Sequence, residues 1–296
     1  MRIGVPREIK DNEYRVGLTP ASVAELVSNG HRVLVEQGAG VGSGLPDDAY
    51  AKAGAQLCHG AEDIFASCEL IVKVKEPQPG EAKLLRPGQM LFTYLHLAPD
   101  PALTRALMES GATCIAYETV TAPTGGLPLL TPMSEVAGRL AAQVGAHYLE
   151  REAGGRGVLL GGVPGVSPAD VLVLGGGVAG ANAARVALGM GATVTVADRS
   201  LETLRRLSAL MPGLRTVFST RAALQALAPR TDLLIGTVLV PGAATPKLVT
   251  REMVASMKQG SVIVDISADQ GGCCETTRPT SHSHPTYVVD GVTHYC

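Results

Sequence analysis

The sequence predicts an α/β protein with two domains, and three observations support this fold class. Short apolar runs that suit strands alternate with segments of helical periodicity along the chain. A turn rich in Pro and Gly interrupts this alternation at 121–128, and 296 residues exceed the usual size of one domain. We therefore expect an N-terminal α/β domain over residues 1–127 and a doubly wound parallel domain, with a long connecting helix, over residues 128–296.

The first domain is predicted to hold several parallel strands. The apolar run at 70–75 is the most informative, because period two places Lys73 and Lys75 on the same face of the strand. A helix is expected from Pro20, a residue that suits a first turn, to Gly30. The strands are expected at 2–5, 32–35, 70–75, 90–96 and 113–118.

A long helix is predicted directly after the linker, from Pro132 to about Arg151. It has apolar residues at intervals of four, which give it one apolar face. These residues are Val136, Leu140, Val144 and Tyr148. The second domain is then expected to have strands at 171–174, 193–197, 215–218, 231–235, 261–265 and 287–289, and helices at 180–189, 200–210, 221–228 and 246–257.

The first strand and helix of the second domain predict a dinucleotide site of the Rossmann type. Gly175, Gly177 and Gly180 form a GxGxxG pattern between them, and Asp198 ends the next strand. The glycines permit a tight turn, a close approach to a pyrophosphate at the helix N-terminus, and close packing of helix and strand. The acid would bind the ribose hydroxyls and repel a 2′-phosphate, which favours NAD over NADP despite the adjacent Arg199. The alternative is a glycine turn without a ligand.

The composition argues against several kinds of partner. A net charge of −2 does not favour nucleic acid or an anionic membrane. The first residues lack the apolar core of a secretory signal, and no apolar run reaches membrane-spanning length, so we expect a cytoplasmic protein. The six cysteines lack CxxC spacing and are expected to be free thiols. No metal is expected, because His282 and His284 have no further ligands nearby in the sequence.

Four residues stand where they could take part in chemistry. Arg15 and Lys75 could neutralise a substrate carboxylate, and His96 could exchange protons near neutral pH. Asp269 follows the predicted strand at 261–265, at the edge where open α/β sheets bind ligands. Each has a simpler interpretation as a surface charge, a solvated strand face, a structural histidine or a turn cap. The pattern alone thus predicts an NAD-linked enzyme of unknown substrate.

Longer motifs make the chain similar to the alanine dehydrogenase family over almost its whole length. They are RIGVPREIKDNEYRVGLTP at 2–20, KVKEP at 73–77, YLHLAPD at 94–100, TPMSEVAGRLAAQ at 131–143, LGGGVAGANAA at 174–184, GTVLVPGA at 236–243 and VDISADQGGCCETTRPT at 264–280. The transhydrogenase alpha subunit and the saccharopine dehydrogenases share the fold and a similar N-terminus. The HLAP and MSEVAGR segments favour alanine dehydrogenase over both.

This resemblance implies reversible oxidative deamination of L-alanine to pyruvate and ammonium, with NAD as hydride carrier, in a cytoplasmic homo-oligomer that is commonly a hexamer. It implies that Arg15 and Lys75 bind the substrate and that His96 and Asp269 are catalytic. A basic residue often follows the ribose-binding acid in the family, whereas Thr203 stands at that position here. The implied NAD contacts are Ser134, Val178, Ala179, Asp198, Thr220, Val238, Leu239, Ile266, Ser267, Ala268, Asp269 and Arg278.

The resemblance also implies residues beyond Cys296, which in the family form a loop over the cofactor and a helix that returns to the first domain. Their absence from this sequence leaves a second hypothesis open. The chain could be a catalytically impaired, NAD-binding remnant that associates with other chains.

Overall fold

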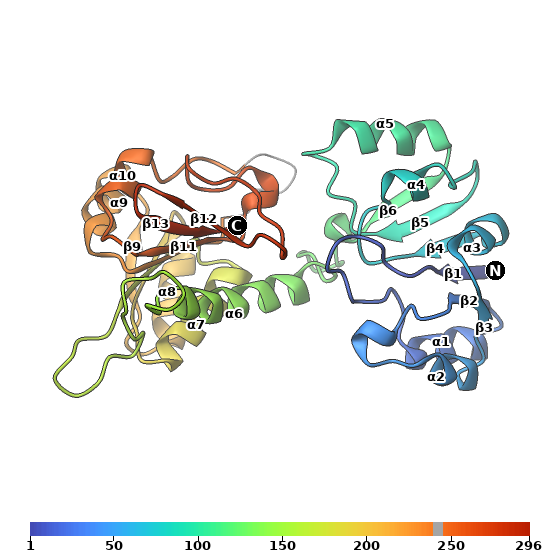
Figure 1. Cartoon of the computed structure of the whole chain (residues 1–296), viewed down its shortest axis with the longest axis horizontal. Coiled ribbons are helices and arrows are strands. Elements are labelled where there is room, and N and C mark those ends of the chain that lie inside the picture. Colours follow the sequence, from blue (N-terminus) through green and yellow to red (C-terminus); the bar gives the residue numbers. More distant parts are fainter. Residues whose placement is uncertain (239–244) are drawn as a thin grey trace. The chain divides into compact units, whose positions relative to one another are not determined.

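The computed structural model describes residues 1–238 and 245–296. It divides into two compact units, Met1–Leu130 and Thr131–Cys296 (Figure 1). Each unit has its own sheet with helices on both faces, which confirms the predicted α/β fold class. Over the described residues, none of the helices combines the length and the apolar character that crossing a membrane requires.

The first unit is built on a six-stranded parallel sheet. Its strands are β1 (Arg2–Val5), β2 (Arg32–Glu36), β3 (Gln56–Cys58), β4 (Leu70–Val72), β5 (Met90–Thr93) and β6 (Thr113–Ala116). Their order is β3-β2-β1-β4-β5-β6, so the direction of winding reverses between β1 and β4. The carboxyl ends of these two strands mark the topological switch point, where open α/β sheets usually bind ligands.

Helices cover both faces of this sheet because its strands are apolar on both sides. One face is covered by α1 (Pro20–Ser28) and α2 (Asp47–Lys52), and the other by α3 (Ala61–Ser67), α4 (Pro79–Ala82) and α5 (Pro101–Ser110) (Figure 1). The helix predicted from Pro20 is confirmed, and its N-cap Thr19 accepts the amide hydrogen of Ser22. Short 3-10 turns lie at Val41–Ser43 and Tyr117–Thr119.

The first unit's strands end earlier than predicted. β4 ends before Lys73, so the period-two argument for Lys73 and Lys75 is wrong, and β5 ends before His96. Lys73 is fully buried and not part of a solvated face. Its ammonium group lies 3.2 Å from the carboxylate of Glu8 and 2.7 Å from that of Glu81. Two buried acids therefore compensate the buried charge of Lys73.

Over its described residues, the second unit is built on a seven-stranded sheet. Its strands are β7 (Asp170–Leu174), β8 (Thr193–Asp198), β9 (Arg215–Phe218), β10 (Leu233–Gly236), β11 (Val262–Asp265), β12 (Thr286–Val289) and β13 (Val292–Tyr295). Their order is β12-β13-β11-β10-β7-β8-β9, with the reversal between β7 and β10. The expectation of a wholly parallel sheet is wrong at one edge, because the tight turn at Asp290 and Gly291 makes β12 and β13 an antiparallel hairpin.

Helices also cover both faces of the second sheet. On one face lie α6 (Thr131–Tyr148), α7 (Val178–Gly189) and α8 (Leu201–Leu210), and on the other α9 (Arg221–Leu227) and α10 (Arg251–Ser256), which is shorter than predicted. Both core clusters are mainly aliphatic, with Val, Leu, Ile and Ala side chains. Further 3-10 turns lie at Ala228–Arg230 and Ala268–Gln270.

The apolar face predicted for α6 is correct in its second half, where Val144 and Tyr148 pack against the core, and wrong in its first half. Val136 is 56% exposed and Leu140 is 44% exposed. The helix instead buries small residues, among them Gly138 and Ala142. A Cβ atom at Gly138 would lie 2.9 Å from the carbonyl carbon of Ala179 in α7, so the absence of a side chain lets the two helices approach closely.

Candidate functional site

Titratable side chains gather at the carboxyl edge of the first sheet. Arg15 follows β1, Lys75 follows β4 and His96 follows β5, and these strands are parallel neighbours. The charge of Lys75 acts on Glu13, which pairs with Arg15. Arg15 in turn interacts with Tyr94, whose ring stacks on His96 with centroids 6.0 Å apart. The structure thus brings the three predicted residues of this unit into one cluster.

Glu13 fixes the guanidinium group of Arg15. Nε of Arg15 donates to Oε1 of Glu13 at 2.8 Å, and Nη2 donates to Oε2 at 2.6 Å. Burial alone would raise the pKa of Glu13, but the hydrogen bonds from Arg15 and the charges of Arg15 and Lys75 lower it. The Arg15 side chain remains 45% exposed. It is therefore oriented and still accessible to a ligand carboxylate.

Lys75 is positioned through its backbone. Its carbonyl accepts a hydrogen bond from Oγ1 of Thr93 at 2.9 Å, and its amide lies 3.4 Å from Oε1 of Glu8. The same oxygen accepts the amide of Val74 at 2.7 Å. Burial raises the pKa of Glu8 despite the lowering effect of the Lys73 charge. Glu8 and Lys73 lie outside the residues predicted from sequence, and they fix the segment that carries Lys75.

His96 has a left-handed backbone with φ of +48°, a conformation that costs about 1–3 kcal/mol in a residue other than glycine. The carboxylate of Glu118 stabilises it by accepting the amides of Leu95 at 3.0 Å and of His96 at 2.8 Å. Nδ1 of His96 lies 3.0 Å from Oε2 of Glu76. Both acids lie outside the site residues predicted from sequence, although Glu76 follows Lys75 directly and Glu118 ends a predicted strand.

The glycine turn of the second unit lies after β7, at the switch point. Gly175 has φ of +95°, a conformation that glycine adopts without strain. Oγ1 of Thr237, after β10, donates to the carbonyls of Leu174 at 2.8 Å and Gly175 at 3.0 Å. A Cβ atom at Gly180 would lie 2.7 Å from that hydroxyl. Thr237 was not predicted as a site residue, and it closes the turn.

The residues present fit a dinucleotide. Gly177 precedes α7 and makes no side-chain cap, and a Cβ atom there would meet no protein atom within 4 Å. This leaves room for a phosphate at a helix N-terminus. The carboxylate of Asp198 accepts the amide of Gly176 at 2.6 Å and that of Ser200 at 2.7 Å. Asp198 therefore stands beside the glycine turn, where a ribose lies in such folds.

Several residues expected to contact NAD surround this turn. Val178 and Ala179 open α7, and Ser134 lies one turn before Gly138 on the face of α6 that meets α7. The methyl group of Thr203 would lie 2.7 Å from a Cβ atom on Gly176. Thr203 therefore packs against the turn.

Other expected contacts lie near the ends of the next strands. Thr220 follows β9 and caps α9 by accepting the amide of Ala223 at 3.1 Å. Val238 follows β10 and packs against the core. Leu239 lies outside the described residues.

The segment after β11 carries Ile266, Ser267, Ala268 and Asp269. The last of these is exposed within a 3-10 turn. Buried Asp265 organises the segment by accepting the hydroxyls of Ser267 at 2.5 Å and Thr277 at 2.6 Å, and the amide of Cys273 at 2.8 Å. Asp265 was not among the site residues predicted from sequence. The guanidinium group of Arg278 lies 4.2 Å from the ring centre of Tyr287.

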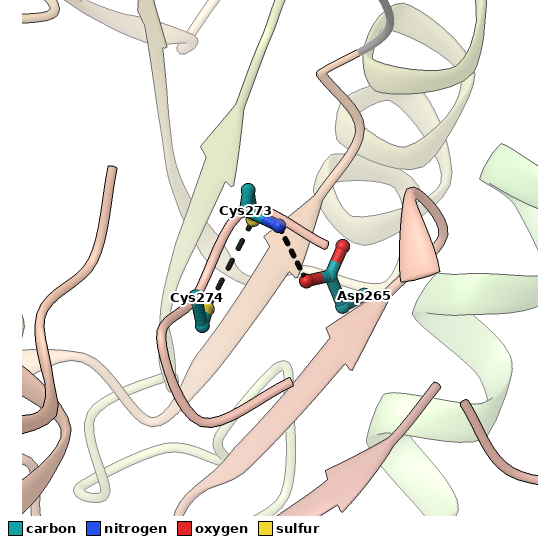
Figure 2. Close-up of side chains that lie close together, drawn as sticks. All are labelled: Asp265, Cys273 and Cys274. Carbon is teal, nitrogen blue, oxygen red and sulfur yellow. Dashed lines mark hydrogen bonds between the residues drawn. The ribbon is translucent and has the colours of Figure 1, made fainter. Parts of the chain in front are cut away.

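Asp265 also lies beside Cys273 and Cys274, and among the described residues these three bring donor atoms close enough to suit a metal ion (Figure 2). The chemistry does not favour one. The hydrogen bond to Cys274 and burial raise the pKa of the Cys273 thiol, whereas a metal ligand must be a thiolate. The two sulfur atoms are 3.9 Å apart and unbonded. We interpret the group as structural.

The comparisons with known proteins cover the whole chain. Residues 4–137 match the family model "Alanine dehydrogenase/PNT, N-terminal domain", and residues 141–296 match its C-terminal domain. Alanine dehydrogenases of Halomonas elongata and Bacillus subtilis are 59% and 53% identical over 297 residues, covering 100% of this chain and 80% and 78% of theirs.

Two solved structures are similar over 100% of the chain. An L-alanine dehydrogenase is 54% identical with a TM-score of 0.93, and the chain covers 82% of it. A transhydrogenase from Sinorhizobium meliloti is 30% identical with a TM-score of 0.84, and the chain covers 86% of it. Both sequence and structure are thus more similar to the dehydrogenase.

Proposed function

The chain belongs to the alanine dehydrogenase/PNT family, and on this premise we propose that it catalyses the reversible NAD-dependent oxidative deamination of L-alanine to pyruvate and ammonium. Identities of 51–59% with alanine dehydrogenases support this activity. The structural observation that carries it is the cluster of Arg15, Lys75 and His96. A guanidinium group, an ammonium group and an imidazole at one sheet edge suit a small substrate with a carboxylate and an amine.

In this scheme the guanidinium group of Arg15 binds the substrate carboxylate, oriented by its fork with Glu13. Lys75 interacts with the carboxylate and the carbonyl that forms at Cα. Its ammonium group suits a developing negative charge on oxygen, and its fixed backbone limits its position.

NAD supplies the acceptor for the hydride that leaves Cα of alanine. Water then adds to the resulting iminium carbon and forms a carbinolamine, from which ammonia departs and leaves pyruvate. His96 removes the proton from the attacking water and returns one to the leaving nitrogen. Asp269 orients the water or stabilises the cationic iminium. Overall, alanine, NAD⁺ and water give pyruvate, ammonium, NADH and a proton.

The cofactor site in this proposal is the glycine turn and its surroundings. Gly175, Gly177 and Gly180 receive the pyrophosphate, and Asp198 binds the ribose hydroxyls. Ser134, Val178, Ala179, Thr203, Thr220, Val238, Leu239, Arg278 and the segment 266–269 line the rest. We also propose that the protein is cytoplasmic and forms a homo-oligomer, a hexamer by family resemblance. Light scattering of the purified protein would test the oligomeric state.

The activity is tested by absorbance at 340 nm with purified protein, L-alanine and NAD⁺. Alanine-dependent NADH formation is expected, and His96→Ala should lower kcat far more than it changes NAD affinity. If no NADH forms while calorimetry still detects NAD binding, the chain is an NAD-binding protein without this activity. Wild-type turnover in His96→Ala would refute the role of His96.

A further inference from the structure

We propose that Glu76 and Lys10 form a positioning pair that fixes the tautomer of His96, so that Nδ1 carries a proton toward Glu76 and Nε2 exchanges protons with the substrate. The inference rests on the proposed function, because it concerns the residue assigned to proton transfer. Neither partner touches the substrate in this scheme. Both act through the imidazole and are positioning residues.

The carboxylate of Glu76 lies between His96 and Lys10 and contacts each of them through a different oxygen. Oε2 of Glu76 lies 3.0 Å from Nδ1 of His96, and Oε1 pairs with the ammonium group of Lys10. Glu76 is mostly shielded from solvent, with 14% of its side chain exposed, against 30% for His96 and 41% for Lys10. The carboxylate is therefore fixed between two donors and has little freedom to rotate away.

The protonation state of the Glu76 carboxyl group determines the tautomer of the His96 imidazole. Burial would raise the pKa of Glu76, but the hydrogen bonds from His96 and Lys10 outweigh burial and lower the pKa to about 2. At neutral pH the carboxylate is ionised and can only accept hydrogen bonds. The hydrogen between Oε2 and Nδ1 must then belong to the imidazole. In the neutral ring this leaves the lone pair on Nε2, the nitrogen that can act as a base.

The backbone of His96 supports the same orientation. Its left-handed φ of +48° sets the direction of the side chain, and Glu118 stabilises that backbone through two amides. The ring also stacks on Tyr94, with an interplanar angle of 27°. Contacts on the backbone, on Nδ1 and on the ring face thus restrict the imidazole.

Lys10 connects His96 to the segment that carries Arg15. Its carbonyl accepts the amide of Glu13 at 3.1 Å, so Lys10 opens the turn that leads to Arg15. The positive charge of Lys10 also partly cancels the electrostatic effect of the Glu76 carboxylate on His96. The same cluster holds Glu118, which accepts the backbone amide of His96, Tyr94, which stacks on its ring, and the cations Arg15 and Lys75. Removing Lys10 should therefore stabilise the imidazolium form.

The first experiment measures turnover of Glu76 and Lys10 variants in the full chain. Glu76→Gln should lower kcat about 10-fold to 100-fold without changing the Kd for NAD, and Glu76→Asp should restore part of the loss. Lys10→Met should shift the acid limb of the pH profile of kcat/KM to higher pH. Lys52→Met is the matched control, because it removes a lysine from an exposed ion pair with Asp48, and its profile should equal wild type.

The second experiment needs no turnover. In ¹⁵N-histidine-labelled protein, the signals of His96 are identified by their loss in His96→Asn, and two-bond ¹H–¹⁵N correlations report which nitrogen is protonated. The proposal requires the Nδ1–H tautomer in wild type and a shift toward Nε2–H in Glu76→Gln. An Nε2–H tautomer in the wild-type protein, or the same tautomer in wild type and Glu76→Gln, overturns the proposal. An unchanged pH profile of kcat/KM in Lys10→Met overturns the role of Lys10. Absent NADH formation in wild type refutes the proposed function, and the spectra still decide the tautomer.

Discussion

Gly177 directly precedes α7 and Gly180 lies in the first turn of that helix, and alanine substitutions at the two positions should affect different properties, NAD binding and stability. A Cβ atom at Gly180 would lie 2.7 Å from Oγ1 of Thr237 and 2.9 Å from the carbonyl carbon of Gly175. A relaxed non-bonded separation is about 3.5 Å. Because part of the obstruction is backbone, no rotamer change relieves it, and α7 must move away from β7.

The magnitudes follow from these contacts. We expect Gly180→Ala to cost about 3 kcal/mol, near the upper end for overpacking, which lowers the Tm of the second unit by roughly 6–12 °C. At Gly177 the added methyl group meets no protein atom within 4 Å, so stability should change by less than about 1 kcal/mol. The same methyl group occupies the space assigned to the pyrophosphate. We expect the Kd for NAD to rise at least about 10-fold, or about 1.4 kcal/mol.

The assay pairs thermal unfolding with titration calorimetry of NAD. Gly189→Ala is the matched control, because Gly189 ends the same helix and a Cβ atom there meets nothing. It should stabilise the protein by about 0.5–1 kcal/mol and leave the Kd unchanged. An unchanged Kd in Gly177→Ala would refute the assignment of the pyrophosphate to this turn. A wild-type Tm in Gly180→Ala would refute the argument from close packing.

Three further predictions concern charge. Lys73→Met leaves the buried carboxylates of Glu8 and Glu81 without their cation; it should cost about 3–5 kcal/mol, and a first-unit Tm within a degree of wild type contradicts this. Asp198→Asn should lower the preference for NAD over NADP, measured as the ratio of kcat/KM values, at least about 10-fold, because the charge that repels a 2′-phosphate is gone; an equal ratio in the two proteins argues against the ribose assignment. The pKa of Glu76 is lowered from 4.5 to about 2, so its stabilising contribution is complete above about pH 4.5 and is lost as the pH falls toward 2. Acid unfolding of Glu76→Gln should therefore be less steep over this range, and parallel curves for the two proteins contradict the pairing.

The strands and the glycine turn could be predicted because short-range geometry determines them. Val171 to Leu174 form an uninterrupted apolar run, and such a run has few alternatives to a central strand buried on both faces. The left-handed backbone at Gly175 is likewise visible locally, because glycine adopts it without strain.

Errors arose where packing overrides the local pattern. The predicted face of α6 followed Val136 and Leu140, but the helix packs through small residues such as Gly138, which carry little hydrophobic signal. From the sequence alone, Lys73 is expected to be a surface charge. In the structure it is buried, because it pairs with Glu8 and Glu81.

The sequence by itself determined the fold class, the dinucleotide turn, and Arg15, Lys75, His96 and Asp269 as candidates, because each follows from a local pattern or a family motif. Only the tertiary structure decided which partners these residues have. Glu76 and His96 are 20 residues apart in the chain and meet because β4 and β5 are neighbours. The orientation of a catalytic side chain depends on such contacts between strands, and local periodicity carries no information about them.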